Sequence, residues 1–254
     1  MIITSKEEHE ILRESGKRLA RIRDLVSAMV APGVSTKTLN EEAERLILDG
    51  GDVPAFLNYT PSESARPYPA TLCVSVNDEV VHGVPNENPY ILNEGDIVGL
   101  DIGLVHRGII TDTAVTVAVG EIDPGAKKLM DYTRQALNAG IKAAKAGNHV
   151  GDIGAAIEKS VGNSYSIVRE LGGHGVGKNV HEDPFIPNFG TPGTGAELVS
   201  GMVLALEPML NEGSEDVRLA PDGFTFKTAD GKLSAHFEHT ILVTDGEAEV
   251  ITKP

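Results

Sequence analysis

The chain has 254 residues and carries 22 Lys and Arg against 37 Asp and Glu, so its formal net charge is −15. This acidity argues against DNA, RNA or an anionic membrane as the main ligand, because all three repel negative charge. The single cysteine excludes an internal disulfide framework, the first segment is charged, and no apolar run approaches the roughly 20 residues that cross a bilayer, so we expect a cytoplasmic protein.

The first half of the chain predicts two helices followed by strands. Apolar residues at helical spacing indicate a long amphipathic helix from about Ser5 to Val30. Ser35 is a suitable N-cap for a second helix, which Gly50-Gly51 would end. A proline-rich loop follows, and strand-like stretches then lead through His82 to a predicted β-hairpin over Ile97–Val119.

The hairpin carries two aspartates in apolar surroundings. If the chain reverses at His106-Arg107, Asp101 lies directly across from Asp112, with both side chains on one face. Like charges in this arrangement repel, and burying unpaired carboxylates costs more than a hairpin gains. A cation between them would remove the conflict. The alternative is a pair of solvated carboxylates on an exposed edge hairpin.

The second half repeats the same order of elements. Pro124 opens a predicted helix to about Ala144, and Asp152 is a suitable cap for a short helix that ends near Val161. Three short motifs recur in order: HGV at 82 and 174, GDIVGLD at 95 and GMVLALE at 201, and DTAV at 112 and EHTI at 238. This weak duplication predicts α+β halves, about 1–120 and 121–254, related by an approximate two-fold and joined into one sheet. Chance similarity between β-rich segments is the alternative.

Each half therefore supplies two isolated carboxylates. Glu207 stands alone in the apolar run 203–210 and Glu238 in the run 235–243, and neither run contains Lys or Arg. Glu is almost never fully buried without a partner. Together with the glycine-flanked His174, the four carboxylates form an oxygen-rich donor set without thiolate, which suits two adjacent Mn²⁺, Fe²⁺ or Co²⁺ ions. Two such ions can hold a bridging hydroxide and polarise a carbonyl group.

The glycines around His174 also imitate nucleotide-binding loops. Gly172–Asn179 departs from the P-loop pattern at its last position, where Asn179 replaces the hydroxyl that binds Mg²⁺. The following residues, 180–187, include two prolines and begin no helix. We therefore expect neither a P-loop nor a dinucleotide site.

Taken together, these motifs strongly resemble the type I methionine aminopeptidases, which have the pita-bread fold. The resemblance covers nearly the whole chain, and its motifs are SVNDEVVHGVP, GDIVGLDIG, TDTAVT, GGHGVGKNVHEDP, GMVLALEPML and SAHFEHTILVTD. It implies one catalytic domain over residues 1–254, an α+β pita-bread fold whose two pseudo-two-fold-related halves form one curved, mostly antiparallel sheet with helices on its outer face. It also implies a hydrolase that removes the initiator methionine, when the second residue is small, through a metal-bridging hydroxide.

The resemblance further implies a role for each candidate site residue. Two divalent ions (Co²⁺, Mn²⁺, Fe²⁺ or Zn²⁺) would be bound by Asp101, Asp112, His174, Glu207 and Glu238. Asp112 and Glu238 would bridge the ions, and Glu207 would also be the general base. His82 would donate to the scissile nitrogen or the tetrahedral intermediate, and His181 would bind the substrate carbonyl and stabilise its oxyanion.

A pocket for the methionine side chain is implied as well. Besides His82 and His181, the substrate-binding residues would be Tyr68, Cys73, Val180 and Phe224. Val180, Phe224 and Ala65 differ from residues that are common at these places in bacterial members. The implied partners are peptide and nascent-chain N-termini, with a transient ribosome contact and no DNA or membrane, and we expect a monomer.

Two other functions remain open from the sequence. A proline-specific peptidase of the same fold usually carries an extra N-terminal domain, for which this chain has no room. A non-catalytic module that binds peptides, RNA or proteins would be expected to lack metal ligands and to have a basic surface. Here the ligand set is intact and the chain is acidic.

Overall fold

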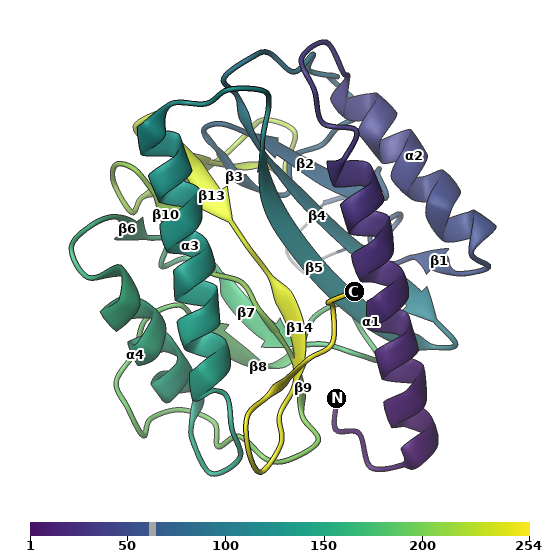
Figure 1. Cartoon of the computed structure of the whole chain (residues 1–254), viewed down its shortest axis with the longest axis vertical. Helices are drawn as coiled ribbons and strands as arrows, with labels where there is room; N and C mark the ends of the chain where they lie inside the picture. Colours follow the sequence, from purple (N-terminus) through teal and green to yellow (C-terminus); the bar gives the residue numbers. More distant parts are fainter. Residues whose placement is uncertain (61–64) are drawn as a thin grey trace.

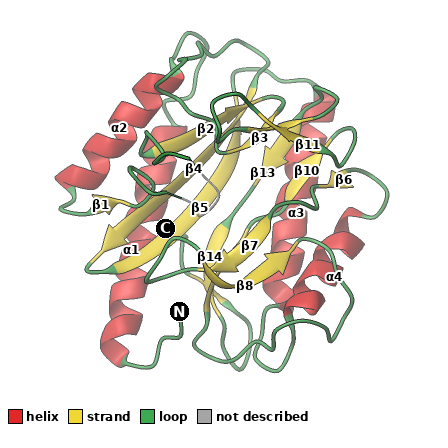
Figure 2. Ribbon diagram, turned by 180° about the vertical axis from the view of Figure 1, so that it is seen from behind, coloured by secondary structure: helices red, strands yellow, loops and turns green. Residues whose placement is uncertain are grey.

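Two pairs of helices lie against a layer of strands in the computed structural model, which describes residues 1–60 and 65–254. The helices are α1 (Lys6–Ser27), α2 (Thr36–Asp49), α3 (Pro124–Ala143) and α4 (Val150–Val161). Figure 1 shows α1 and α3 in front of the strands, and Figure 2 shows the strands from behind. Each half thus begins with a helix pair, as predicted, while the middle of the predicted proline-rich loop lies outside the described residues.

The strands form four hydrogen-bonded groups. In the first half they are β1 (Val53–Pro54), β2 (Leu72–Val76), β3 (Glu79–Val81), β4 (Ile97–His106) and β5 (Ile109–Ala118). In the second half they are β6 (Ser166–Ile167), β7 (Gly172–Gly175), β8 (Glu182–Pro187), β9 (Val203–Leu206), β10 (Met209–Asn211), β11 (Val217–Leu219), β12 (Phe226–Thr228), β13 (Ser234–His236), β14 (His239–Leu242) and β15 (Glu249–Val250). In the first group the strand order is β1-β4-β2, and β5 also pairs with β4. The orders in the other three groups are β13-β10-β6, then β11-β12-β3, and then β15-β14-β9-β7-β8. Their pairings are antiparallel.

The first helix begins and packs as its sequence predicts. Ser5 is the N-cap: its hydroxyl accepts a hydrogen bond from the Glu8 amide, and the Glu8 carboxylate accepts one from the Ser5 amide. Leu12, Leu19 and Val26 recur on one face and are buried where α1 crosses β4 and β5. Burying each of these side chains contributes about 2 kcal/mol, which holds α1 on the strands.

The caps of the later helices agree with the sequence in one case and differ in the other. Asp123 caps α3, because its carboxylate accepts a hydrogen bond from the Gly125 amide at 2.6 Å. α4 begins two residues before the predicted cap Asp152, and its N-cap is His149. The Asp152 carboxylate accepts a hydrogen bond from the His149 amide at 2.7 Å, so it stabilises the first turn from inside the helix.

The central hairpin of β4 and β5 has a different register from the predicted one. Arg107 and Gly108 form its two-residue turn, and both have positive φ (48° and 80°), as the turns that suit twisted hairpins require. Asp101 therefore lies opposite Ala114 and not, as predicted, opposite Asp112. Because the shift amounts to two residues, both carboxylates still lie on the same face, and the electrostatic conflict between them remains.

The two halves meet between residues 112–116 of β5 and residues 236–240, a contact that we call the seam. Ala114 and Glu238 exchange backbone hydrogen bonds across it, at 2.9 and 3.4 Å. β5 and the β13–β14 segment consequently lie side by side at the centre of the strand layer (Figures 1 and 2).

Threonine side chains supply the other hydrogen bonds of the seam. Thr240 Oγ1 donates to the Asp112 carbonyl at 2.7 Å and accepts from the Asp112 amide at 2.9 Å. Thr116 Oγ1 makes the same two contacts with the backbone of His236, at 2.8 and 2.9 Å. In a regular sheet these backbone N–H and C=O groups would bond to the neighbouring strand. At the seam the threonine hydroxyls bond to them instead.

Separate apolar clusters hold each helix pair on its strands. The cluster under α1 and α2 includes Leu19, Leu39, Ile47, Leu72, Leu100 and Ile102. The cluster under α3 and α4 includes Leu129, Leu137, Ile153, Ile157, Leu204 and Ile241. In the parts of the chain that the structure describes, none of the helices is both long and apolar enough to span a membrane.

Replacing Thr240 with Val should lower the free energy of unfolding by about 2 kcal/mol or more, because both backbone groups of Asp112 would lose their buried partner. Urea unfolding of metal-free protein measures this change. Thr38→Val, on the exposed face of α2, is the matched control and should change stability by less than about 0.5 kcal/mol. Equal effects of the two substitutions would show that the seam does not depend on the hydroxyl.

Candidate metal centre and active site

Four carboxylates and one imidazole meet in one cavity. Asp101 lies on β4, Asp112 on β5, His174 on β7, Glu207 directly after β9, and Glu238 between β13 and β14. All five side chains line a cavity of about 60 Å³. One ligand atom each of Asp112, His174 and Glu238 lies within 4.8 Å of the other two. The structure therefore brings together all five residues that were predicted as metal ligands, from both halves of the chain.

Several carboxylate oxygens at this centre are buried and unpaired. Asp101, Asp112 and Glu238 are 9%, 4% and 2% exposed, and each has one oxygen without a hydrogen-bond partner in the described part of the chain. A buried polar atom without a partner costs about 1–3 kcal/mol, and more when it is charged. A divalent cation among these oxygens would remove that cost, so the residues present fit a metal ion.

Burial also changes the charge that these carboxyl groups carry. It raises the pKa of Asp101 to about 6. It raises the pKa of Asp112 and of Glu238 well above their usual range, and repulsion adds to the effect, from Asp101 on Asp112 and from Asp112 on Glu238. In the absence of metal the centre therefore holds protons near neutral pH, which a cation must displace in order to bind.

Glu207 has a different electrostatic environment, because two imidazoles face it. His174 Nε2 lies 3.3 Å from one Glu207 oxygen, and His236 Nε2 lies 3.6 Å from the other. Burial acts to raise the pKa of Glu207, but His174 and His236 outweigh it and hold this pKa at about 2. Burial alone would lower the pKa of His174, but the Glu207 carboxylate has the larger effect, so the pKa of His174 is raised. Glu207 is therefore ionised at neutral pH.

The sequence analysis missed His236. It is 3% exposed, and its Nε2 has no hydrogen-bond partner within residues 1–60 and 65–254. It lies two residues before Glu238, in the apolar run 235–243, which contains no Lys or Arg. A histidine in that run was the signal that could have identified it.

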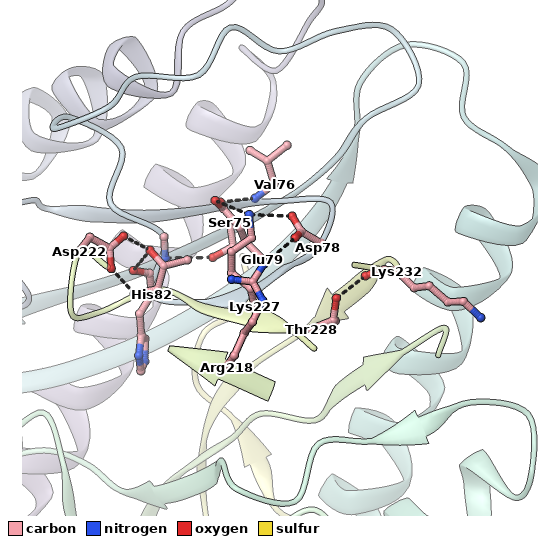
Figure 3. A network of polar contacts seen from close by, with 12 residues as sticks. Ser75, Val76, Asp78, Glu79, His82, Arg218, Asp222, Lys227, Thr228 and Lys232 are labelled. Atoms are coloured by element: carbon pink, nitrogen blue, oxygen red, sulfur yellow. Dashed lines mark hydrogen bonds and ion pairs between the residues drawn. The ribbon is translucent and has the colours of Figure 1, made fainter. Parts of the chain in front are cut away.

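His82 follows β3 and has a left-handed backbone conformation, with φ of 60°. The next residue must be glycine, because a Cβ on Gly83 would overlap the carbonyl oxygen of Val74. Thr225 Oγ1 donates to the Asp222 carboxylate at 2.6 Å and lies 3.4 Å from the His82 carbonyl oxygen. Figure 3 shows the His82 imidazole pointing away from this network, so the backbone is held on one side while the ring lines the cavity.

His181, directly before β8, is the second imidazole predicted to contact substrate. Its ring meets that of His174 edge to face, with centroids 4.5 Å apart, and its Nδ1 lies 2.8 Å from the Tyr59 hydroxyl oxygen. Burial lowers the pKa of both His82 and His181 to about 4, although part of His181 remains open to solvent. Both rings are therefore neutral at pH 7.

An apolar pocket adjoins the carboxylates. The four predicted pocket residues are at most 5% exposed and line the same cavity: Tyr68, Cys73, Val180 and Phe224. The rings of Tyr68 and Phe224 meet edge to face, with centroids 5.2 Å apart. Burial raises the pKa of the Cys73 thiol and of the Tyr68 phenol, so both side chains are neutral in this pocket.

Three residues add detail to the surroundings of the pocket. Ala65 is exposed and does not line the inner cavity. Phe56, which the sequence analysis missed, forms part of the wall. Tyr59 was missed as well, and its contact with His181 joins positions 122 residues apart, which no local pattern indicates.

A wider cleft of about 860 Å³ opens beside the inner cavity. His82, His174, His181 and Glu207 line both spaces. An extended molecule could therefore place one apolar side chain in the inner pocket, one bond beside the carboxylates and imidazoles, and its remainder in the cleft. This arrangement suits hydrolysis next to a chain end.

Comparison with known proteins agrees with this geometry. The model of metallopeptidase family M24 matches residues 10–245. The chain is 42% identical over 253 residues to a methionine aminopeptidase of Clostridium perfringens, a match that covers 99% of this chain and 98% of that protein. It is 41% identical over 254 residues to methionine aminopeptidase 1 of Bacillus subtilis, covering 100% and 99%. The crystal structure of methionine aminopeptidase from Thermotoga maritima matches with a TM-score of 0.94 at 41% identity and covers 100% of both chains.

Metal affinity should increase with pH. Because the fold raises the pKa of Asp101 to about 6, the metal-free native state keeps a proton that the unfolded chain loses near pH 4. The metal-free protein should therefore lose stability as the pH rises from about 4 through 6, and metal binding should release protons. Isothermal titration calorimetry with Mn²⁺ should show an association constant about fivefold or more higher at pH 6 than at pH 5, because the ionised fraction of a carboxyl with a pKa of about 6 rises by this factor. A constant independent of pH would contradict proton displacement at this centre.

Proposed function

The chain belongs to metallopeptidase family M24 and to its methionine aminopeptidases, and from this premise we propose that two divalent metal ions at the buried carboxylates serve the removal of N-terminal methionine. The protein is a hydrolase that removes methionine from the N-terminus of its substrates. Its α+β fold is the pita-bread fold that the sequence motifs implied. The observation that carries the metal assignment is the set of buried carboxylate oxygens that have no partner among the described residues.

Both halves of the chain supply the proposed ligands, which are Asp101, Asp112, His174, Glu207 and Glu238. Asp112 and Glu238 are the bridging ligands in this proposal, as the family resemblance implies, and each has a buried oxygen without a partner among the described residues. Oxygen donors with one imidazole favour Mn²⁺, Fe²⁺ or Co²⁺, and Zn²⁺ is also compatible. When bound, the ions would activate a water held between them and polarise the scissile carbonyl.

Three side chains move or hold protons in the proposed reaction. The ionised carboxylate of Glu207 takes a proton from the attacking water and delivers it to the departing amine. His181 donates its N–H to the carbonyl oxygen of the scissile peptide bond, where negative charge develops. His82 donates to the scissile nitrogen or to the tetrahedral intermediate. Because both imidazoles are neutral, each has one N–H for this purpose.

The inner pocket is proposed to bind the methionine side chain. Tyr68, Cys73, Val180, Phe224 and Phe56 offer a neutral apolar surface of the kind that suits a thioether. The pocket adjoins the five proposed metal ligands, so the free amine of the same residue would lie beside the metal site. We also propose, from the family resemblance, that the substrates have a small second residue.

The cellular setting follows from the substrate. Nascent chains begin with methionine, so we place the enzyme in the cytoplasm, in transient contact with ribosomes and as a monomer. The ligand set spans the seam, and residues 1–254 are accordingly proposed to act as one catalytic domain.

Metal-loaded protein should release methionine from Met-Ala-Ser and leave Gly-Pro and Ala-Pro-Ala intact, because the pocket accepts a long unbranched side chain at the chain end. Mass spectrometry of the products measures all three reactions. Removal of metal with a chelator should abolish the release, and Mn²⁺, Fe²⁺ or Co²⁺ should restore it. Hydrolysis of the proline peptides alone would indicate the proline-specific alternative, and no methionine release with any of these ions would refute the proposal.

His181→Ala should lower kcat on Met-Ala-Ser by about 100-fold while metal content stays unchanged, because it removes one donor to the developing oxyanion. Elemental analysis gives the metal content. Asp112→Ala is the contrasting variant and should lose both activity and bound metal, since it removes a bridging ligand. Loss of metal from His181→Ala would make His181 a ligand, contrary to the role assigned here.

A further inference from the structure

We propose that Tyr59 is a positioning residue, whose hydrogen bond to Nδ1 of His181 keeps the imidazole hydrogen on Nε2, where it can be donated to substrate. The inference rests on the proposed function, in which His181 donates to the scissile carbonyl. It concerns a side chain that neither the motifs nor the cavity lining identified.

The contact between Tyr59 and His181 is direct. The Tyr59 hydroxyl oxygen lies 2.8 Å from Nδ1, and the two rings meet edge to face, with centroids 5.4 Å apart and an interplanar angle of 62°. His181 also packs against the ring of His174, at 4.5 Å and 83°. The His181 imidazole therefore lies between two aromatic neighbours, which restricts rotation of its ring.

The chemistry of the two groups determines which one donates. A phenol O–H is a stronger acid than the N–H of a neutral imidazole, and an imidazole nitrogen is a stronger acceptor than a phenol oxygen. A tyrosine phenol has an ordinary pKa of about 10, and burial raises that of Tyr59 further, so the phenol keeps its hydrogen at neutral pH and can donate it. Tyr59 therefore donates to Nδ1, and the single hydrogen of the His181 ring lies on Nε2.

Backbone hydrogen bonds hold Tyr59 at the base of the loop that follows it. The Tyr59 amide donates to the Phe56 carbonyl at 2.9 Å, and the Asn58 amide donates to the Tyr68 carbonyl at 2.9 Å. The Tyr68 amide donates back to the Tyr59 carbonyl at 2.8 Å, and its hydroxyl donates to the Gly83 carbonyl at 2.8 Å. The base of the loop is thus tied to the segment that carries the other proposed catalytic imidazole.

The hydrogen bond matters because the two tautomers of His181 act oppositely on substrate. With the hydrogen on Nε2, the ring donates to the scissile carbonyl oxygen. With the hydrogen on Nδ1, Nε2 presents a lone pair to that oxygen, and the two acceptors repel each other. The Tyr59 hydroxyl acts through His181 by favouring the first form, as the third group of a catalytic triad does for its histidine.

Tyr59→Phe tests this role, since it removes only the hydroxyl. We expect kcat on Met-Ala-Ser to fall about tenfold or more, KM to change by less than about threefold, and metal content to stay constant. Tyr132→Phe, on a tyrosine whose ring packs against Tyr165, is the matched control and should change none of these values. In a His181→Ala background, Tyr59→Phe should have no further effect.

Nitrogen-15 NMR of histidine-labelled, Zn²⁺-loaded protein reads the tautomer without turnover. The wild-type spectrum should show the His181 hydrogen on Nε2, and the Nδ1–H form should appear in Tyr59→Phe. The proposal is wrong if wild-type His181 carries its hydrogen on Nδ1, if the substitution leaves tautomer and kcat unchanged, or if the double variant shows additive losses. Wild-type protein that releases no methionine would instead refute the proposed function, and the spectra would still decide what the hydrogen bond does.

Discussion

Three carboxylates, those of Asp101, Asp112 and Glu238, are buried together without a Lys or Arg partner in the described residues. Desolvation and mutual repulsion oppose this arrangement, and both act to raise the pKa of these carboxyl groups. Apolar residues of similar volume would give a more stable core at the same place. A cation bound at the centre would offset this unfavourable free energy. The same repulsion that destabilises the metal-free protein therefore favours metal binding.

The seam decides where this conflict is located. Glu238 occupies the break between β13 and β14, and its backbone pairs with Ala114 of the first half. Glu207 occupies a similar break, between β9 and β10. An interrupted strand frees its side chain from the strict alternation of a sheet, and here both carboxylates line the cavity that Asp101 and Asp112 also line. Threonine hydroxyls such as that of Thr240 replace the lost ladder contacts, so the strands remain joined where their regular pairing stops.

Features that depend on neighbours in the sequence could be predicted, and features that depend on distant contacts could not. The N-cap of α2 at Ser35, the hairpin and the isolated carboxylates belong to the first group, whereas α4 begins at the N-cap His149 and not at the predicted Asp152. The hairpin register was wrong by two residues because Arg107 and Gly108 form the turn, and strand alternation kept the carboxylates on one face despite the error. Tyr59 belongs to the second group, since its partner His181 is brought near only by the complete fold. His236 lies between the two groups, because its place in an apolar run was visible in the sequence but its contact with Glu207 was not. The assignment of bridging and general-base roles came from the family resemblance. Each carboxylate lies in a similar apolar run, so the local sequence does not distinguish one role from another.

The left-handed backbone at His82 has a consequence for how this enzyme can be improved. A residue with a Cβ is disfavoured there by about 1 kcal/mol, whereas glycine would adopt the same conformation without strain. A screen that rewards thermal tolerance alone would thus tend to accept glycine at this position and discard the imidazole. Thermal stability and catalytic activity therefore favour different residues at position 82, so a variant engineered for stability should keep His82.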